Sequence, residues 1–165
     1  MARLIPNENT RVLFVPTIAD EDLNPTIAEL ASGPSDDAVD LTEFLVTLDA
    51  STTGNTVPTP SFASLFETSI AGTVSATFTA EFYRDDTNDT AWDTLPRATN
   101  GYFVIARFGF GGSGGEPAAD DEVEVWPVLI TARSAMSLTN NEVQRFGIES
   151  SVPVEPNEAA VVSAT

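Results

Sequence analysis

One stretch of the chain alternates strictly between apolar and polar residues: Gly72-Thr73-Val74-Ser75-Ala76-Thr77-Phe78-Thr79-Ala80-Glu81-Phe82-Tyr83-Arg84. Because successive side chains of a β-strand point to opposite faces, this period of two predicts an antiparallel strand with one buried face. The even positions from Val74 to Phe82 are expected to be buried. The odd positions form a polar row on the other face: Thr73, Ser75, Thr77, Thr79 and Glu81.

The rest of the chain also favours strands, because Thr and Val are abundant, Pro and Gly recur often, and no long helical periodicity is present. Further strands are expected at residues 11–15, 43–50, 101–108, 123–132 and 143–152. Pro127 lies inside one of them, which predicts a sheet edge or a bulge there. The pattern therefore indicates a mainly β domain.

Two helices are expected beside these strands. The first begins at Asn24-Pro25, an N-cap residue followed by proline, and ends before Gly33. The second lies within residues 87–95. On it Trp92 and Leu95 are three positions apart, so both side chains are expected to pack against the sheet.

Three segments are expected to lie outside the β domain of residues 10–152 or to project from it. Residues 1–9 form an N-terminal arm, and residues 153–165 form a loose C-terminal tail without aromatic residues. Residues 51–70 form a long Thr- and Pro-rich connection that carries Phe62, Leu65 and Phe66. A structureless loop of this length is uncommon unless it is functional, so it is expected to dock on its own domain or on a neighbour.

The composition excludes several kinds of active site. The 165 residues include 25 acids and seven bases, all arginine, with no His, Cys or Lys, and the formal net charge is −18. Triads that use His or Cys, Schiff bases and Cys-based metal sites are therefore impossible. Binding along a DNA backbone is not expected, because neutralising the phosphates needs clustered Lys and Arg side chains. No apolar run is long enough to cross a membrane, so no membrane contact is expected.

Two motifs have a structural explanation that we prefer to a catalytic one. Residues 109–114 match G-x-G-x-x-G, but an acidic, non-helical segment follows, so a flexible connection is expected rather than a nucleotide site. Glu122 and Glu124 share a strand face and resemble paired catalytic carboxylates, although solvated charge is the simpler interpretation. We therefore expect no enzyme activity, no metal and no cofactor.

Several longer strings resemble major tail tube proteins of long non-contractile-tailed (siphovirus) phages of actinobacteria. In chain order they are residues 1–10 (MARLIPNENT), 54–60 (GNTVPTP), 65–68 (LFET), 82–86 (FYRDD), 90–96 (TAWDTLP), 101–105 (GYFVI), 123–128 (VEVWPV) and 152–156 (VPVEP). They occur along nearly the whole chain.

The resemblance implies an antiparallel β-sandwich or barrel-like subunit with one packed α-helix and a short second helix. It implies six-membered rings that stack into a hollow virion tail tube, assembled in the host cytoplasm. The implied partners are further copies of the chain, a tape measure protein, baseplate or distal tail proteins and a tail terminator. Viral DNA would pass through the lumen during ejection without specific binding.

Contacts between subunits are expected in the N-terminal arm and the 51–70 connection. The candidate residues are Leu4, Ile5, Pro6, Phe62, Leu65 and Phe66. The polar row from Thr73 to Glu81 is expected to face either the lumen or a neighbouring subunit. Two alternatives remain open: a capsid decoration or head–tail completion protein, and a carbohydrate-binding β-sandwich that uses Trp126 and Tyr102.

Overall fold

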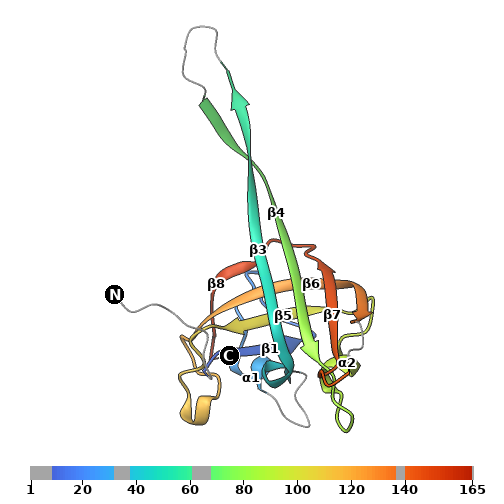
Figure 1. Cartoon of the computed structure of the whole chain (residues 1–165). Helices are drawn as coiled ribbons and strands as arrows, with labels where there is room; N and C mark the ends of the chain where they lie inside the picture. Colours follow the sequence, from blue (N-terminus) through green and yellow to red (C-terminus); the bar gives the residue numbers. More distant parts are fainter. Residues whose placement is uncertain (1–8, 32–37, 61–67, 137–139, 165) are drawn as a thin grey trace, which may run out of the picture.

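The computed structural model describes residues 9–31, 38–60, 68–136 and 140–164. Eight strands form one antiparallel sheet in the order β2-β1-β5-β6-β7-β4-β3, with β8 paired to β6 (Figure 1). The strands are β1 (Arg11–Val15), β2 (Val39–Asp40), β3 (Leu45–Thr59), β4 (Thr68–Tyr83), β5 (Asn100–Ala106), β6 (Glu122–Ala135), β7 (Arg145–Ser151) and β8 (Asn157–Val161). The mainly β prediction is confirmed, and none of the described helices is long or apolar enough to cross a membrane.

The helices are shorter than predicted. They are α1 (Ile27–Leu30), α2 (Thr90–Thr94) and the 3-10 turns η1 (Thr42–Phe44) and η2 (Ser113–Gly115). The predicted start of the first helix at Asn24-Pro25 is wrong by two residues. Thr26 is the cap instead, because its hydroxyl accepts a hydrogen bond from the Glu29 amide while the Glu29 carboxylate accepts one from the Thr26 amide.

The core has two layers, one on each side of β1, β5 and β6. In β1, Val12 and Phe14 belong to the first layer, whereas Leu13 and Val15 belong to the second. These three strands are therefore buried on both faces, which explains their nearly continuous apolar runs. The first layer is closed by β4 and β7, and the second by the chain around α1 and by β8. The result is the expected sandwich-like arrangement.

Pro127 lies in β6, an interior strand and not an edge strand, but at a point where β6 has a partner on one side only. It pairs with Tyr102 of β5 and is buried. On the other side of β6, residues 122–125 pair with β8 and residues 129–135 pair with β7. Proline is accommodated at the gap between these two partners, where a ladder hydrogen bond is not required.

The prediction of a loose C-terminal tail is also wrong. Residues 157–161 form β8, which pairs with the first part of β6. Ala160 and Val162 are buried in the second core layer. The short alternation around these two residues is enough to bury one face, although no aromatic residue marks it.

Candidate assembly surfaces

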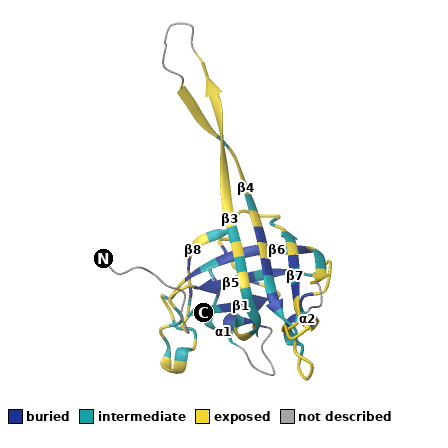
Figure 2. Ribbon diagram, viewed as in Figure 1, coloured by how far each residue is buried: buried dark blue, intermediate teal, exposed yellow. Residues whose placement is uncertain are grey.

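A long hairpin of β3 and β4 rises out of the body (Figure 1). The two strands pair from Leu45 with Phe82 to Thr59 with Thr68. All residues from 51 to 60 are exposed, which corresponds to roughly 30 Å of ribbon beyond the core (Figure 2). The predicted structureless connection at 51–70 is therefore wrong, because most of it is strand.

The β-branched content of this segment explains why it forms a ribbon. Thr, Val and Ile favour extended backbone, and paired hydroxyls support it across the strands. Ser51 and Thr77 lie 3.1 Å apart between hydroxyl oxygens, and Thr59 and Thr68 lie 2.8 Å apart. Phe62, Leu65 and Phe66 lie in residues 61–67, and Leu4, Ile5 and Pro6 in residues 1–8, outside the described part of the chain.

The alternating strand predicted at residues 72–84 has its buried face only inside the body. Phe78, Ala80 and Phe82 are buried, but Val74 is 59% exposed because that part of β4 belongs to the projecting ribbon. The odd positions from Thr73 to Thr79 are exposed and Glu81 is half-buried. The polar row therefore exists, and only its outer half lacks a buried opposite face.

This polar row continues sideways over four strands, β3, β4, β7 and β6. The register aligns Asp49, Thr79, Glu149 and Ala132, and one step away it aligns Ser51, Thr77, Ser151 and Leu129. A further row contains Thr47, Glu81, Gly147 and Ser134. Because the opposite side of these strands packs on the core, the sheet presents one broad face to its surroundings. This face is rich in hydroxyls and carboxylates on β3 and β4 and less polar on β6.

Trp92 and Leu95 both lie against the first core layer. Leu95 is fully buried, and the half-buried Trp92 ring meets Phe146 edge-on at 5.1 Å between centroids. The guanidinium carbons of Arg84 and Arg133 lie 3.8 and 3.6 Å from the centre of the Trp92 ring. Arg133 also donates to the Trp92 carbonyl at 2.6 Å, so α2 is held to the sheet by apolar, cation–π and hydrogen-bond contacts.

The loop before α2 is ordered by the carboxylates within it. The amides of Thr87 and Asn88 donate to Asp85, which lowers the pKa of the Asp85 carboxyl below its usual value. Asp89 pairs with Arg84 at 2.5 Å. Within the described ranges, no group of three or more acidic residues is arranged to hold a metal ion.

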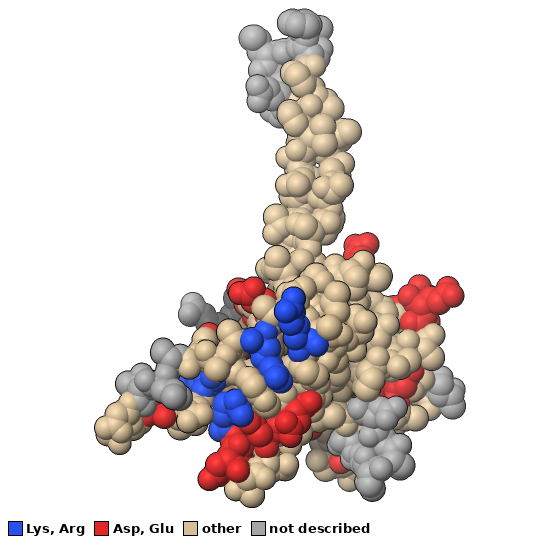
Figure 3. Space-filling model, turned by 90° about the vertical axis from the view of Figure 1, so that its right-hand side faces the viewer, with Lys and Arg blue, Asp and Glu red and all other residues tan. Residues whose placement is uncertain are grey.

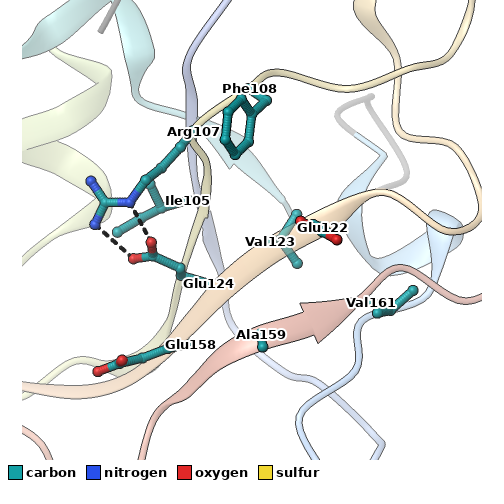
Figure 4. Close-up of a pocket in the computed structure, with 9 residues that line it drawn as sticks. All are labelled: Ile105, Arg107, Phe108, Glu122, Val123, Glu124, Glu158, Ala159 and Val161. Atoms are coloured by element: carbon teal, nitrogen blue, oxygen red, sulfur yellow. Dashed lines mark hydrogen bonds and ion pairs between the residues drawn. The ribbon is translucent and has the colours of Figure 1, made fainter. Parts of the chain in front are cut away.

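A pocket of about 200 Å³ lies at the N-terminal end of β6, between the C-terminal end of β5 and β8 (Figure 4). Its polar wall includes Arg107, which forms an ion pair with Glu124 through two nitrogens, the Nη2 atom at 2.8 Å from Oε2. These hydrogen bonds raise the pKa of the Arg107 guanidinium. Glu122 and Glu158 complete the acidic rim, and Phe108 beside them is 64% exposed.

The geometry does not support the catalytic interpretations of the motifs. Glu124 is neutralised by Arg107, so it is not available as one of a pair of catalytic carboxylates with Glu122. Trp126 is 1% exposed and cannot stack on a sugar. The glycine-rich loop is held by Asp121, whose carboxylate accepts from the amides of Gly111 and Ala118. It leads into the 3-10 turn η2 and not into a helix that could bind phosphate.

The comparison with family models identifies the chain. The model described as phage tail tube protein matches residues 1–165. The chain belongs to the phage tail tube protein family. None of the curated proteins matches it in sequence.

Two solved structures share the fold of this tail tube family member. One is the tail of an empty gene transfer agent particle computed with helical refinement in C6 symmetry: 15% identity, 74% of this chain, 86% of that chain and a TM-score of 0.51. The other is the virion of the native gene transfer agent particle: 14% identity, 81% of this chain, 100% of that chain and a TM-score of 0.51. At such low identity these similarities show the fold alone.

Proposed function

We propose that this protein is the repeating subunit of a phage tail tube, in which hexameric rings stack into a hollow virion tail that conducts DNA during ejection. In this proposal it is a structural protein rather than an enzyme. The family membership supports the tube role, and the resemblance to proteins of long non-contractile-tailed actinobacterial phages supports a siphovirus tail. Assembly would take place in the host cytoplasm.

The projecting hairpin is the observation that carries the proposal. An isolated two-stranded ribbon is marginally stable in water, because it has no packed face. Here the ribbon is long, and Val57, Ile70 and Val74 on it are between 49% and 59% exposed. A neighbouring ring would cover these side chains when the hairpin reaches across the stacking interface. Phe62, Leu65 and Phe66 between the strands, and Leu4, Ile5 and Pro6 in the arm, are the further residues proposed for contacts between subunits.

The polar sheet face is the surface proposed for the lumen. Its Ser, Thr and carboxylate rows repel DNA phosphates or leave them unbound, because like charges repel across an aqueous gap. Such a wall would let DNA slide without specific binding. The next row on this face pairs Tyr83 with Arg145, whose guanidinium lies over the Tyr83 ring at the margin of the polar rows. The tape measure protein would occupy the same lumen during assembly, and distal tail or baseplate proteins and a terminator would cap the two ends of the tube.

Shortening the hairpin tests the stacking role. Ser51 and Thr77 face each other in the register, so residues 52–76 can be replaced by Asn-Gly, the preferred two-residue hairpin turn. The shortened protein is expected to keep its free energy of unfolding within about 1 kcal/mol, because most of the removed residues are exposed. It is expected to form no tubes in the electron microscope under conditions where the full chain does.

Two results of the shortening experiment need to be distinguished: normal tubes, and loss of the fold. Normal tubes from the shortened protein would remove the hairpin from the stacking interface and contradict the proposal. A shortened protein that unfolds would be uninformative alone, so Ile70→Ser with Val74→Ser is the second variant: both side chains are 59% exposed in the subunit, so the fold should be retained while tube formation is lost.

A further inference from the structure

The two ends of β6 carry opposite charge. Near its C-terminal end lie three arginines, which we call the arginine face: Arg97, Arg133 and Arg145. Arg145 begins β7 and pairs with Tyr83, and Arg97 precedes Ala98 and Thr99, whose backbones bond to Ile130 of β6. Arginine side chains gather below the hairpin on this side of the molecule, with carboxylates beneath them (Figure 3).

Among the described residues, the arginine face has no acidic ion-pair partner. The two ion pairs among the described residues use Arg84 and Arg107, and none involves the three arginines of this face. The formal net charge of the chain is nevertheless −18. Three arginines outside the described ion pairs, on one side of so acidic a protein, indicate a surface suited to carboxylates from outside the subunit.

The pocket beside Phe108 has the complementary chemistry. Glu122 is exposed and has no hydrogen-bond partner among the described residues. Within the same part of the chain, Glu158 accepts a hydrogen bond only from the Thr52 hydroxyl at 3.0 Å, and its charge also acts on Arg107. The exposed Phe108 ring lines the same pocket, and in Figure 4 it lies near Arg107, with Glu122 to its right and Glu158 at the lower left. A pocket lined by two carboxylates and an exposed aromatic ring suits guanidinium groups, which bond to carboxylates and stack on rings.

We propose that the arginine face of one subunit docks on the Phe108 pocket of the next subunit within a ring. The proposal rests on the self-assembly proposed above and assigns the contact that joins neighbours. Because the two surfaces lie at opposite ends of one strand, the contact is head-to-tail, and such contacts either close into rings or continue as filaments. Contact of either surface with its own copy would bring like charges together, which disfavours a two-fold dimer.

Charge reversal at each surface tests this pairing. Arg97→Glu with Arg145→Glu makes both ends acidic, and Glu122→Arg with Glu158→Arg makes both ends basic. All four side chains are exposed, so each variant should fold. Arg133 is kept, since it packs on Trp92. Alone, each variant should need roughly tenfold more protein than wild type to assemble, as measured by sedimentation.

Mixing the two variants gives the decisive result. Acidic-ended and basic-ended subunits can alternate around an even-membered ring, so an equimolar mixture should assemble at nearly the wild-type concentration. Failure of the mixture to assemble would overturn the pairing, and so would normal assembly of either variant alone. If wild type forms tubes, the tube role would remain intact in both cases.

The Glu43→Arg variant is the control for a change of net charge. Glu43 is exposed on η1, outside both surfaces, so this variant should assemble like wild type.

A wild-type protein that never assembles would contradict the tube role instead. Sedimentation of the mixed variants would still decide the pairing in that case. Heterodimers would support it, and separate monomers would overturn it.

Discussion

Trp92 joins the short helix α2 to the sheet through several kinds of contact at once. Its ring meets Phe146 edge-on and lies against the guanidinium groups of Arg84 and Arg133. The three-residue spacing of Trp92 and Leu95 predicts that both pack on the sheet, but nothing local to the helix identifies the two arginines. Arg133 is 41 residues away along the chain, and only the sheet register brings it to Trp92.

Substituting Trp92 measures the value of these contacts. Trp92→Ala is expected to lower the free energy of unfolding by about 2–3 kcal/mol, because it removes an aromatic pair and both cation–π contacts from a half-buried site. Trp92→Phe keeps a ring beside Phe146 and should lose about 1 kcal/mol. Equal stability of all three proteins in chemical denaturation would show that α2 is held by Leu95 alone.

Residue-level features set by local chemistry were partly predictable. The Thr26–Glu29 capping box has a sequence signature, yet Asn24-Pro25 is an equally good helix start on composition. The difference is tertiary. Asn24 instead accepts a hydrogen bond from the Val161 amide at 3.1 Å, and Pro25 accepts one from the Ser163 amide at 2.8 Å. Both residues therefore tie the C-terminal segment down and do not begin the helix.

At the scale of elements, strands that form only by pairing with distant segments explain the two main errors of the sequence-based prediction. Residues 51–59 read as a loop because Thr, Pro and Gly are common in turns, whereas the pairing with residues 68–77 makes them a strand. Residues 157–161 read as a tail because they lack aromatic residues, whereas the free side of β6 gives them a partner. Strands 11–15, 101–108 and 143–152 were predictable because their apolar patterns are strong without context.

A buried charge in β8 tests whether the C-terminal segment is part of the fold. Ala160 is fully buried and its neighbour Ala159 is exposed, so the two alanines form a matched pair. Ala160→Asp is expected to lower the free energy of unfolding by about 3 kcal/mol or more, because it places an unpaired carboxylate in the second core layer.

The control keeps the charge and changes only the burial. Ala159→Asp should stay within about 0.5 kcal/mol of wild type in the same thermal or chemical denaturation. If Ala160→Asp were equally harmless, residues 157–161 would be a loose tail after all.

For the whole molecule, the sequence predicted a mainly β body but not how its surfaces divide. Three strands are buried on both sides, while β3, β4 and β7 keep one face polar and open. The alternation in β4 indicates such a face, but only the register shows that Asp49, Thr79 and Glu149 form one row across strands. The assembly account depends on three surfaces: the open face, the hairpin and the two charged ends of β6.

Cryo-electron microscopy of the purified protein at high concentration tests the central claim most directly. The account predicts hollow tubes built from stacked six-membered rings, with the Asp49–Thr79–Glu149 row facing the lumen and the hairpin crossing to the next ring. Closed particles, trimers, or tubes that carry this row on their outer surface would contradict it.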